Sequence, residues 1–331
     1  MKTSLGLDIS KDTFNGYYYN EKIEKDLKFD NNQAGFNQLH VFLQNQKDTS
    51  DLYVTMENTG TYHLKLAVYL TDLGYKVAVV NPTRIKNYAK MKMLRTKTDK
   101  LDAKTIAQFG SEQPFSPFKP NSLQSYKLRY YLQAIDDLKK VRTQFICQLE
   151  ALGTIPFDMS DIISEWNGKI ESFDASIKDF EKKISEIISE HYQQEYKCLN
   201  SIPGIGKRLV PIILAYFGCF ESFEHSKQAA AYIGINPRVC ESGTSVHKSG
   251  HISKQGNRYI RKMFYMASLS AARFNHQCLN LAKRLKEKNK PTKVIYIAVA
   301  NKLLRQVFAI VKYKRIYHPD YISVYPKENI A

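Results

Sequence analysis

The chain has 331 residues, a length that suits about two domains. Hydrophobic residues make up 43% and charged residues 24%, which excludes a disordered or fibrous protein. The 49 Lys and Arg residues outnumber the 32 Asp and Glu residues. The resulting net charge of +17 predicts a polyanionic partner, either nucleic acid or an anionic membrane.

A membrane is the weaker of these two predictions. The longest uninterrupted apolar run, 209–217, is less than half of the roughly 20 residues that a spanning helix needs. Asp8 interrupts the first apolar stretch, so we expect no signal peptide and a cytoplasmic protein. The cysteines are odd in number and have no metal-ligand spacing, so we expect buried thiols at Cys147, Cys198, Cys219, Cys240 and Cys278.

Strands and helices alternate in the N-terminal region. We expect strands at 3–8, 14–19, 22–29, 52–57 and 77–80, and helices at 32–46, at 61–73 and after Asn81-Pro82. This alternation predicts an α/β sheet with helices packed on it. The domain is expected to span 1–112, because Pro114, Pro117 and Pro120 form an extended linker after it.

A helical arm is expected at 113–196, after which a mostly helical domain spans 197–331. Apolar residues recur every three or four positions from Leu132 to Leu152, which predicts a helix. From Trp166 to Ile187 the apolar steps alternate between 4 and 3, the 3.5-residue period of a coiled-coil seam. Either a loop around Pro156 folds the two helices into an antiparallel hairpin, or the seam pairs with another subunit.

Four acidic residues are candidates for a metal site. Asp8 and Glu57 end two predicted strands, and groups at the carboxyl ends of neighbouring strands converge on the crevice where α/β proteins bind ligands. Asp99 and Asp102 have an i, i+3 spacing that places both on one helix face. Four carboxylates in one pocket need a divalent cation, and oxygen ligands suit magnesium or manganese. Taken singly, Asp99 also suits a helix cap.

Basic residues crowd the segment 84–104, where the only acids are Asp99 and Asp102. We expect nucleic-acid contacts from Arg84, Lys90, Lys92, Arg95 and Lys97. An enzyme acting on a nucleic-acid backbone needs cations to hold the polymer and carboxylates to hold the metal. A helix with a solvated basic face is the alternative.

The segment Ser201-Ile-Pro-Gly-Ile-Gly-Lys-Arg-Leu209 resembles a helix-hairpin-helix element. Its glycines, Gly204 and Gly206, would let backbone amides approach a phosphate closely, beside Lys207. An ordinary glycine turn between helices is the alternative. Apolar-faced helices are expected near 257–285 and 292–312.

The C-terminal region has a second basic stretch, with no acid between Glu241 and Glu287. We expect phosphate contacts from Lys248, Lys254, Arg258, Arg261 and Lys262. Ring-bearing side chains are interleaved with them and suit base stacking, although tyrosines on an apolar face are commonly core residues. They are His247, His251, Tyr259, Phe264 and Tyr265.

Short motifs are spread over nearly the whole chain. They are Gly6-Leu-Asp-Ile-Ser-Lys11, Met56-Glu-Asn-Thr-Gly60, Val80-Asn-Pro82, Lys97-Thr-Asp-Lys-Leu-Asp-Ala103, Ile202-Pro-Gly-Ile-Gly206, Tyr232-Ile-Gly-Ile-Asn-Pro237, Ser242-Gly243 and Gly250-His-Ile-Ser-Lys-Gln-Gly256. Together they resemble those of insertion-sequence transposases of the IS110 type, relatives of the Piv/MooV DNA invertases.

The resemblance implies a RuvC-like, ribonuclease H-type N-terminal domain with an Asp-Glu-Asp-Asp (DEDD) quartet, here Asp8, Glu57, Asp99 and Asp102. It also implies a coiled-coil arm and a helical domain that carries a serine nucleophile. Members of this family act as oligomers, so a dimer or tetramer is expected. A structured bridge RNA that pairs with donor and target DNA is a further implied partner.

Ser242 is the expected nucleophile. Gly243 follows it and leaves room for a backbone to approach, and the Ser-Gly pair is similar to the family's catalytic position. The competing serines are Ser245, Ser249 and Ser253, of which Ser253 is expected to cap the helix that follows. A serine hydroxyl needs a base or metal to become a good nucleophile. We expect that help from the acidic quartet, reached by folding or from a second subunit.

Two other functions are open alternatives to a recombinase. A metal-dependent junction resolvase would hydrolyse DNA without a covalent protein intermediate and would not need the serine. A non-enzymatic DNA or RNA binder would use the basic surfaces alone and would process DNA no differently after loss of any of the four acids.

Overall fold

A computed structural model describes most of the chain. It covers residues 3–20, 23–46, 52–58, 60–94, 99–114, 116–119, 122–238, 241–242, 246–247 and 251–320, with the backbone alone at 99–100, 238, 241–242 and 246–247. The chain divides into two compact units, Met1–Pro120 and Asn121–Ala331. The predicted C-terminal domain and the predicted arm from residue 121 onward fall in the second unit, whereas residues 113–120 of the predicted arm belong to the first.

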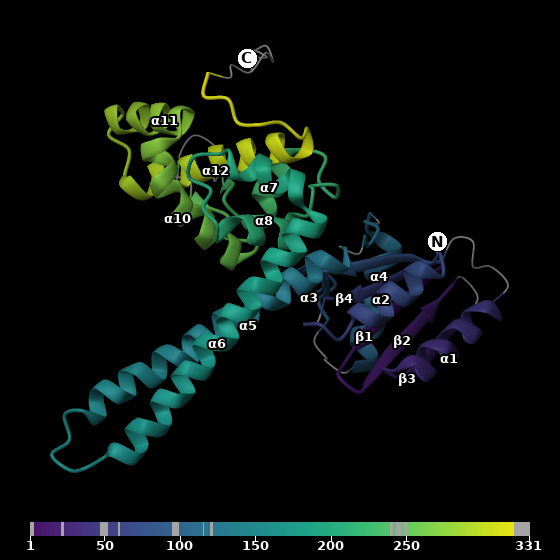
Figure 1. The fold of residues 1–331 in the computed structure, drawn as a ribbon. Coiled ribbons are helices and arrows are strands. Elements are labelled where there is room, and N and C mark those ends of the chain that lie inside the picture. The colour runs from purple at the N-terminus through teal and green to yellow at the C-terminus, as the bar shows by residue number, and fades with distance from the viewer. Residues whose placement is uncertain are drawn as a thin grey trace. The chain divides into compact units, whose positions relative to one another are not determined.

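The N-terminal unit is built on a five-stranded mixed sheet with the strand order β3-β2-β1-β4-β5 (Figure 1). The strands are β1 (Ser4–Ile9), β2 (Thr13–Tyr19), β3 (Glu24–Asp30), β4 (Tyr53–Glu57) and β5 (Lys76–Val80). The first three form the expected antiparallel meander, whereas β4 pairs parallel with both β1 and β5. The predicted α/β fold is confirmed, and its order and pairing are ribonuclease H-like.

Helices cover both faces of this sheet. Leu5, Leu7 and Ile9 point to one face, where helices α1 (Gln33–Gln44) and α2 (Leu64–Asp72) complete a buried core. Helix α4 (Asp99–Glu112) covers the other face over β1, β2 and β4. Helix α3 (Pro82–Met91) starts where expected, because the Asn81 side chain accepts a hydrogen bond from the Thr83 amide and Pro82 suits a first helical turn.

The arm is an antiparallel pair of long helices, α5 (Leu123–Leu152) and α6 (Ser160–His191), which lie side by side along their length (Figure 1). Aromatic rings form much of the seam. Phe145 lies 5.5 Å from Trp166 and 5.7 Å from Phe173 between ring centroids. The seam predicted at 166–187 therefore packs within the chain, and the hairpin alternative is confirmed.

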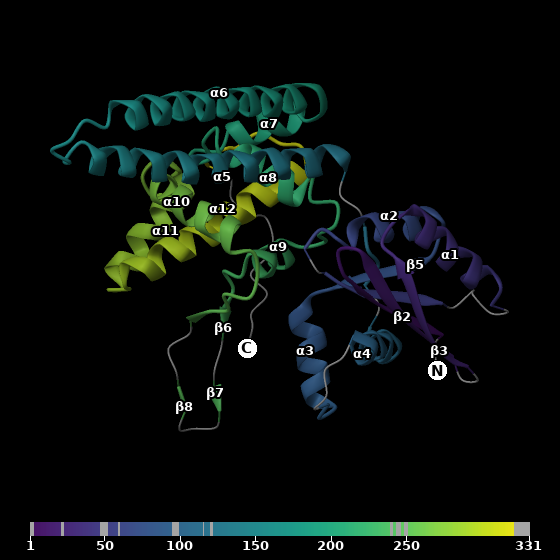
Figure 2. The same ribbon diagram turned by 90° about the horizontal axis from the view of Figure 1, so that it is seen from below.

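The rest of the second unit is helical, as predicted. Its helices are α7 (Gln193–Asn200), α8 (Leu209–Phe217), α9 (Ser226–Ile233), α10 (Arg258–Phe274), α11 (His276–Glu287) and α12 (Thr292–Lys312). Between α9 and α10, β6 (Pro237–Arg238) pairs with β9 (His251–Ile252), and β7 (Glu241–Ser242) pairs with β8 (Val246–His247). We call these four short strands the ribbon; Figure 2 shows it extending away from α9.

Helix α12 is a core helix of this unit. In the described part of the chain it is the one helix whose length and composition would allow it to cross a membrane. Val299, Leu303 and Val307 on α12 are nevertheless fully buried against neighbouring helices. A buried core helix passes the same test, so this property is weak evidence for a membrane span.

The expectation that every cysteine is buried is wrong. Cys198 and Cys278 are buried, and burial raises the pKa of the Cys278 thiol to about 12. Cys147 is exposed on α5, because its position lies off the seam of the arm, and Cys219 is half-buried. Cys240 lies outside the described residues.

Candidate active site

Asp8 and Glu57 occupy adjacent positions at the ends of two parallel strands. The register pairs Ser4 with Tyr53 and continues to Leu7 with Met56, so that Asp8 and Glu57 come next. Because side chains alternate along a strand, Asp8 shares its face with Ser4 and Gly6, the residues that contact α4. The predicted convergence of these two acids is a direct result of sheet register.

Helix α4 brings the other two acids to the same end of the sheet. Gly110 packs against Ser4, whereas Ala103 and Ala107 pack against Gly6. The helix therefore runs antiparallel to β1, and its first turn lies near the ends of β1 and β4. Asp99 is the first residue of α4, and the partly exposed Asp102 is one turn further on.

Close packing at Gly6 fixes this helix. A Cβ atom on Gly6 would lie only 2.2 Å from the backbone nitrogen of Ala107 and 2.3 Å from the carbonyl oxygen of Ala103. The Ser4 hydroxyl donates a 2.8 Å hydrogen bond to the carbonyl oxygen of Ala107. The glycine in the first motif is thus required by helix–sheet contact at the acidic site.

The acids form a suitable donor set for a divalent cation. Carboxylate oxygens are the ligands that such cations prefer. Among the side chains that the structure describes, no three from Asp, Glu, His or Cys lie close enough together to hold a metal ion, and the Asp99 side chain is outside that set. The backbone brings all four positions to one end of the sheet.

Asn15 is a neighbour of the site that the sequence analysis missed. It pairs with Asp8 across β1 and β2, and alternation places it on the α4 face of the sheet. Its amide offers a neutral oxygen or a hydrogen-bond donor beside the acids. The meander predicted at 3–19 contained this information, because the register of the first hairpin determines the partner of Asp8.

Two cations of the segment 84–104 are used inside the N-terminal unit. Lys104 lies 3.2 Å from the Glu24 carboxylate and 4.8 Å from the Tyr17 ring centroid. Lys92 makes a 2.9 Å ion pair with Glu112. Lys92 is therefore a weaker candidate for phosphate contact than the sequence indicated.

The remaining predicted contacts in this segment divide into two groups. Arg84 and Lys90 are exposed. Arg95 and Lys97 lie outside the described residues.

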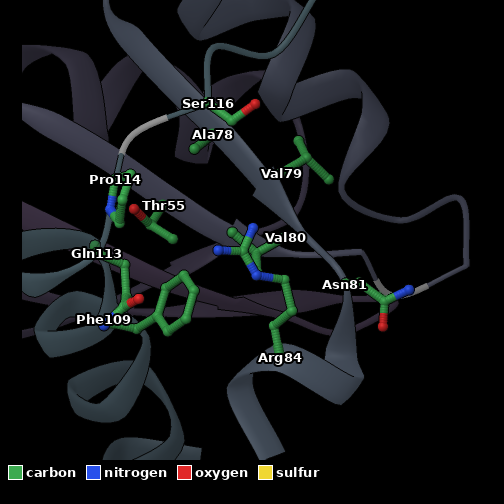
Figure 3. Close-up of a pocket in the computed structure, with 11 residues that line it drawn as sticks. Thr55, Ala78, Val79, Val80, Asn81, Arg84, Phe109, Gln113, Pro114 and Ser116 are labelled. Atoms are coloured by element: carbon green, nitrogen blue, oxygen red, sulfur yellow. The ribbon is translucent and has the colours of Figure 1, made fainter. Parts of the chain in front are cut away.

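A pocket lies in the N-terminal unit between β5, the start of α3 and the C-terminal end of α4 (Figure 3). It has a volume of about 260 Å³, and its wall includes Thr55, two residues before Glu57 on β4. The Arg84 guanidinium lies 5.1 Å from the centroid of the Phe109 ring and points toward Thr55. This cation–π contact orients Arg84 over the sheet.

The helix-hairpin-helix segment lies between α7 and α8, but its two glycines differ. Gly204 has a φ of +101°, and a Cβ there would lie 2.7 Å from the Cβ of Ala271 on α10. Gly204 thus allows close approach of a neighbouring helix. The expectation that it allows close approach of a phosphate is corrected accordingly. Gly206 and Lys207 are exposed, and phosphate contact there stays a prediction.

The predicted phosphate contacts of the second unit also divide. Arg258, Lys262 and Lys254 are exposed. Arg261 instead donates hydrogen bonds to the carbonyl oxygens of Ile233, at 2.8 Å, and of Lys254, at 3.3 Å. Arg261 therefore holds the start of α10 to the end of α9, and Lys248 lies outside the described residues.

The aromatic candidates have different environments. Phe264 is fully buried in the core and cannot stack on a base, so that expectation is wrong. Tyr259 is half-buried, and burial raises the pKa of its hydroxyl above the usual range. Tyr265 is partly exposed and His251 is exposed. The side chain of His247 is outside the described set.

Ser242 lies in strand β7 and pairs with Val246 of β8. Its side chain is outside the described set, as are Ser245 and Ser249. Ser253 does not cap the next helix, because Asn257 accepts hydrogen bonds from the amides of Tyr259 and Ile260. The expected cap at Ser253 is therefore wrong.

A ribonuclease H-like sheet with acids at the ends of β1 and β4 and at the start of α4 defines the DEDD class of metal-dependent nucleic-acid enzymes. Two family models, both of transposases, together match most of the chain. The model of the IS110-type DEDD transposase domain matches residues 5–154, and that of the transposase IS116/IS110/IS902 family matches residues 196–283.

Several curated proteins are similar to this chain. The pilin gene-inverting proteins of Moraxella bovis and Moraxella lacunata are each 32% identical to it, over 95% of this chain and 97% of their own length. The transposase for insertion sequence element IS1111A of Coxiella burnetii is 24% identical over 58% of each chain. The chain belongs to the IS110 family of transposases. It is a recombinase-type enzyme that binds DNA and uses divalent metal.

Proposed function

We propose that this protein cuts and rejoins DNA at an insertion sequence with two chemical groups: a magnesium or manganese site at Asp8, Glu57, Asp99 and Asp102, and a nucleophile at Ser242. The observation that carries the proposal is the convergence of the four acidic positions at the ends of β1 and β4 and the start of α4. Such positions are held by backbone hydrogen bonds and helix packing. A substrate phosphate can therefore be oriented against them.

The chain's own residues have separate roles in this proposal. The four carboxylates would hold the metal, which when bound neutralises charge on the scissile phosphate. Exposed cations such as Arg258 and Lys262 would hold the DNA backbone. We assign no substrate contact to Lys104, because Glu24 and Tyr17 already engage it.

Ser242 would attack phosphorus and join the protein to DNA. Its hydroxyl oxygen forms the new ester bond, the DNA oxygen leaves, and the serine proton passes to a base. We assign that activation to the acidic quartet. Strand transfer then depends on groups from both units, supplied by one chain or by two within a dimer or tetramer.

A bridge RNA is the third part of the proposal. The support is the net charge of +17, which suits more than one polyanionic partner. Purification of the protein from its host followed by sequencing of bound RNA tests this part. Recovery of one enriched structured RNA supports guidance by RNA, and recovery of none contradicts it.

The metal site is tested by strand transfer with Asp102→Asn, which removes one charge and keeps the side-chain shape. Loss of an outer-shell partner commonly costs 10- to 100-fold in activity, so loss of a ligand should cost at least about 100-fold. Asp12→Asn is a matched control at an exposed acid. Full activity of Asp102→Asn with an unchanged melting temperature would remove Asp102 from the site.

The nucleophile is tested by trapping the reaction and mapping the modified peptide by mass spectrometry. We expect a DNA adduct in the wild type and in Ser245→Ala, and none in Ser242→Ala. An adduct that persists in Ser242→Ala contradicts the assignment. Metal-dependent cleavage with no adduct even in the wild type would favour the resolvase alternative.

A further inference from the structure

A groove of about 840 Å³ lies in the second unit, between α12, α10 and the start of the ribbon. Pro237 of β6 and Ile252 of β9 pair with each other and form one wall. Helix α12 forms the opposite wall with residues at 294, 297, 301 and 305, one face of the helix. The volume falls within the range of about 300–1,000 Å³ that is typical of ligand sites.

The rim of the groove is strongly basic. Lys254, Lys293, Lys302 and Arg305 line it, and no acidic side chain is among its described lining residues. None of these four cations forms an ion pair with a residue that the structure describes. Three of them belong to α12, beyond the basic stretch 242–286 noticed in the sequence. Four cations around one groove, none of them in an ion pair among the described residues, favour an anionic occupant.

The floor is apolar and contains one aromatic ring. Ile252, Leu281 and Ile297 contribute aliphatic surface, and Tyr265 contributes a partly exposed ring. Tyr296 contacts this ring edge-on, with centroids 6.2 Å apart, which holds its orientation. Of the two neighbouring aromatics on α10, Phe264 lies in the core and Tyr265 faces the groove.

We propose that this groove binds a single-stranded segment of nucleic acid, with bases against Tyr265 and the aliphatic floor and phosphates on the four cations. Binding sites for single strands combine a cationic groove with aromatic platforms. A duplex presents phosphates outward and keeps its bases stacked inside, so it would leave the apolar floor without a partner. The proposal rests on the proposed function, because a recombinase that opens DNA or carries a guide RNA has single strands to bind.

The groove also has a defined place in the reaction. The ribbon that carries Ser242 begins at its wall, since Pro237 lies five residues before Ser242 in the chain. A strand held in the groove would therefore leave it beside the base of the ribbon. Tyr265, Lys302 and Arg305 are positioning residues in this proposal and have no part in bond cleavage.

The test measures binding of a fluorescent single-stranded DNA, an RNA of the same sequence and the corresponding duplex to the full chain over a series of salt concentrations. One variant combines Lys302→Gln with Arg305→Gln. Its matched control combines Lys178→Gln with Lys182→Gln, two exposed positions on α6. A second pair compares Tyr265→Leu with the conservative Tyr265→Phe, and melting temperatures verify folding.

We expect the Lys302/Arg305 variant to weaken single-strand binding and to make its salt slope shallower by about 0.7 for each phosphate that the variant no longer neutralises. Tyr265→Leu should weaken single-strand binding by about 10-fold, and Tyr265→Phe should retain it. Duplex binding should change much less. A loss confined to RNA, or to DNA, supports the proposal and identifies which strand the groove holds.

Three results would overturn the proposal. The first is that the groove variants bind single strands as well as the control variant does. The second is that they lose as much affinity for the duplex as for single strands. The third is that they change only the sedimentation of the protein, which would assign the groove to contact with a second copy of the chain. Normal binding by the groove variants, together with loss of strand transfer in Asp102→Asn, would reject the groove and leave the proposed function standing. A wild-type protein that binds no DNA at all would reject the proposed function itself.

Discussion

The two units place their charged groups by different physical means. In the N-terminal unit the acids follow from sheet register, since Asp8 and Glu57 directly follow the last residues paired between β1 and β4, Leu7 and Met56. In the second unit the cations lie on helix surfaces, as Arg258 and Lys262 do on α10. A residue placed by register depends on the packing of the whole sheet. A residue on a helix surface can be removed with little effect on its neighbours.

This difference predicts two kinds of response to mutation. Substitutions at the acidic site or at its contact with α4 should abolish activity almost completely, because α4 packs on the sheet in a single arrangement. Changes on the basic surfaces should act in small and nearly additive steps, because each cation contributes separately.

The largest effect is expected for Gly6→Val. A Cβ at this position would lie 2.2 Å from the backbone nitrogen of Ala107, so α4 must move away from the sheet. We expect a loss of about 3 kcal/mol in the free energy of unfolding of the N-terminal unit. Metal-dependent strand transfer should be lost with it. Denaturant unfolding and the strand-transfer assay measure the two effects.

Gly168→Ala is the control for this substitution. A Cβ at Gly168, within α6, meets no atom within 4 Å, so a gain of about 1 kcal/mol from helix propensity is expected. If Gly6→Val kept both stability and activity, the contact between α4 and β1 would not be what positions the acids.

The next largest effect is expected for Asn275→Leu, at the junction of α10 and α11. The Asn275 amide donates to the Gln306 side chain at 2.9 Å and to the Pro203 carbonyl at 3.3 Å, and its oxygen accepts from the Cys278 amide at 3.2 Å. Replacing this fully buried residue leaves its hydrogen-bond partners unsatisfied and should cost about 2 kcal/mol. Calorimetry of the second unit's transition measures it.

Asn280→Leu is the matched control on α11, where Asn280 is exposed. Its effect should remain within about 0.5 kcal/mol. Equal effects at the two positions would mean that the buried network of Asn275 contributes nothing to the stability of the helical core.

The predictability of the site from sequence follows the same contrast. Asp8 and Glu57 were identifiable because strand ends are local features, and the arm was identifiable because its period of 3.5 extends over many residues. The register of the first hairpin could also have predicted Asn15 as the neighbour of Asp8. These features depend on neighbours in the sequence or on one regular pattern.

Features that depend on distant residues were missed. Lys104 belongs to the basic segment 84–104, yet its partner Glu24 is 80 positions away in the sequence. Ser253 looked like a cap, but backbone bonds from Lys254 to Gly234 and from Asn257 to Tyr232 join this loop to α9 and move the cap to Asn257. The groove combines residues around the ribbon with residues of α10, α11 and α12, so no single stretch of sequence revealed it.

A smaller, graded effect is expected for the exposed cations of the second unit. Binding to duplex DNA should fall steeply with salt, and Arg258→Gln or Lys262→Gln should each make the slope shallower by about 0.9. Fluorescence titrations over a salt series measure the slope. Lys92→Gln should change it less, because Glu112 already pairs with Lys92 at 2.9 Å.

A flat salt response of the wild type would contradict phosphate binding by either unit. Arg261→Gln provides a further contrast within α10. Because Arg261 bonds the carbonyl of Ile233, this variant should lower the melting temperature more than it changes the slope.

The smallest effect is expected at Glu24, where α4 is joined to β2 and β3. Hydrogen bonds from the Tyr17 hydroxyl and from Lys104 hold the pKa of the Glu24 carboxyl below its usual value of 4.5. A carboxyl with a lowered pKa in the folded state stabilises that state above pH 4.5 and loses this contribution as the pH falls through the folded value. Glu24→Gln should therefore lower the melting temperature of the N-terminal unit slightly at neutral pH, and the difference from wild type should vanish in acid.

Asp72→Asn on α2 is the control, because it makes the same charge change at an exposed position of the same unit. Because solvent screens an exposed ion pair, a shift as large as that of Gly6→Val would mean that side-chain charge, rather than backbone packing, holds α4 against the sheet.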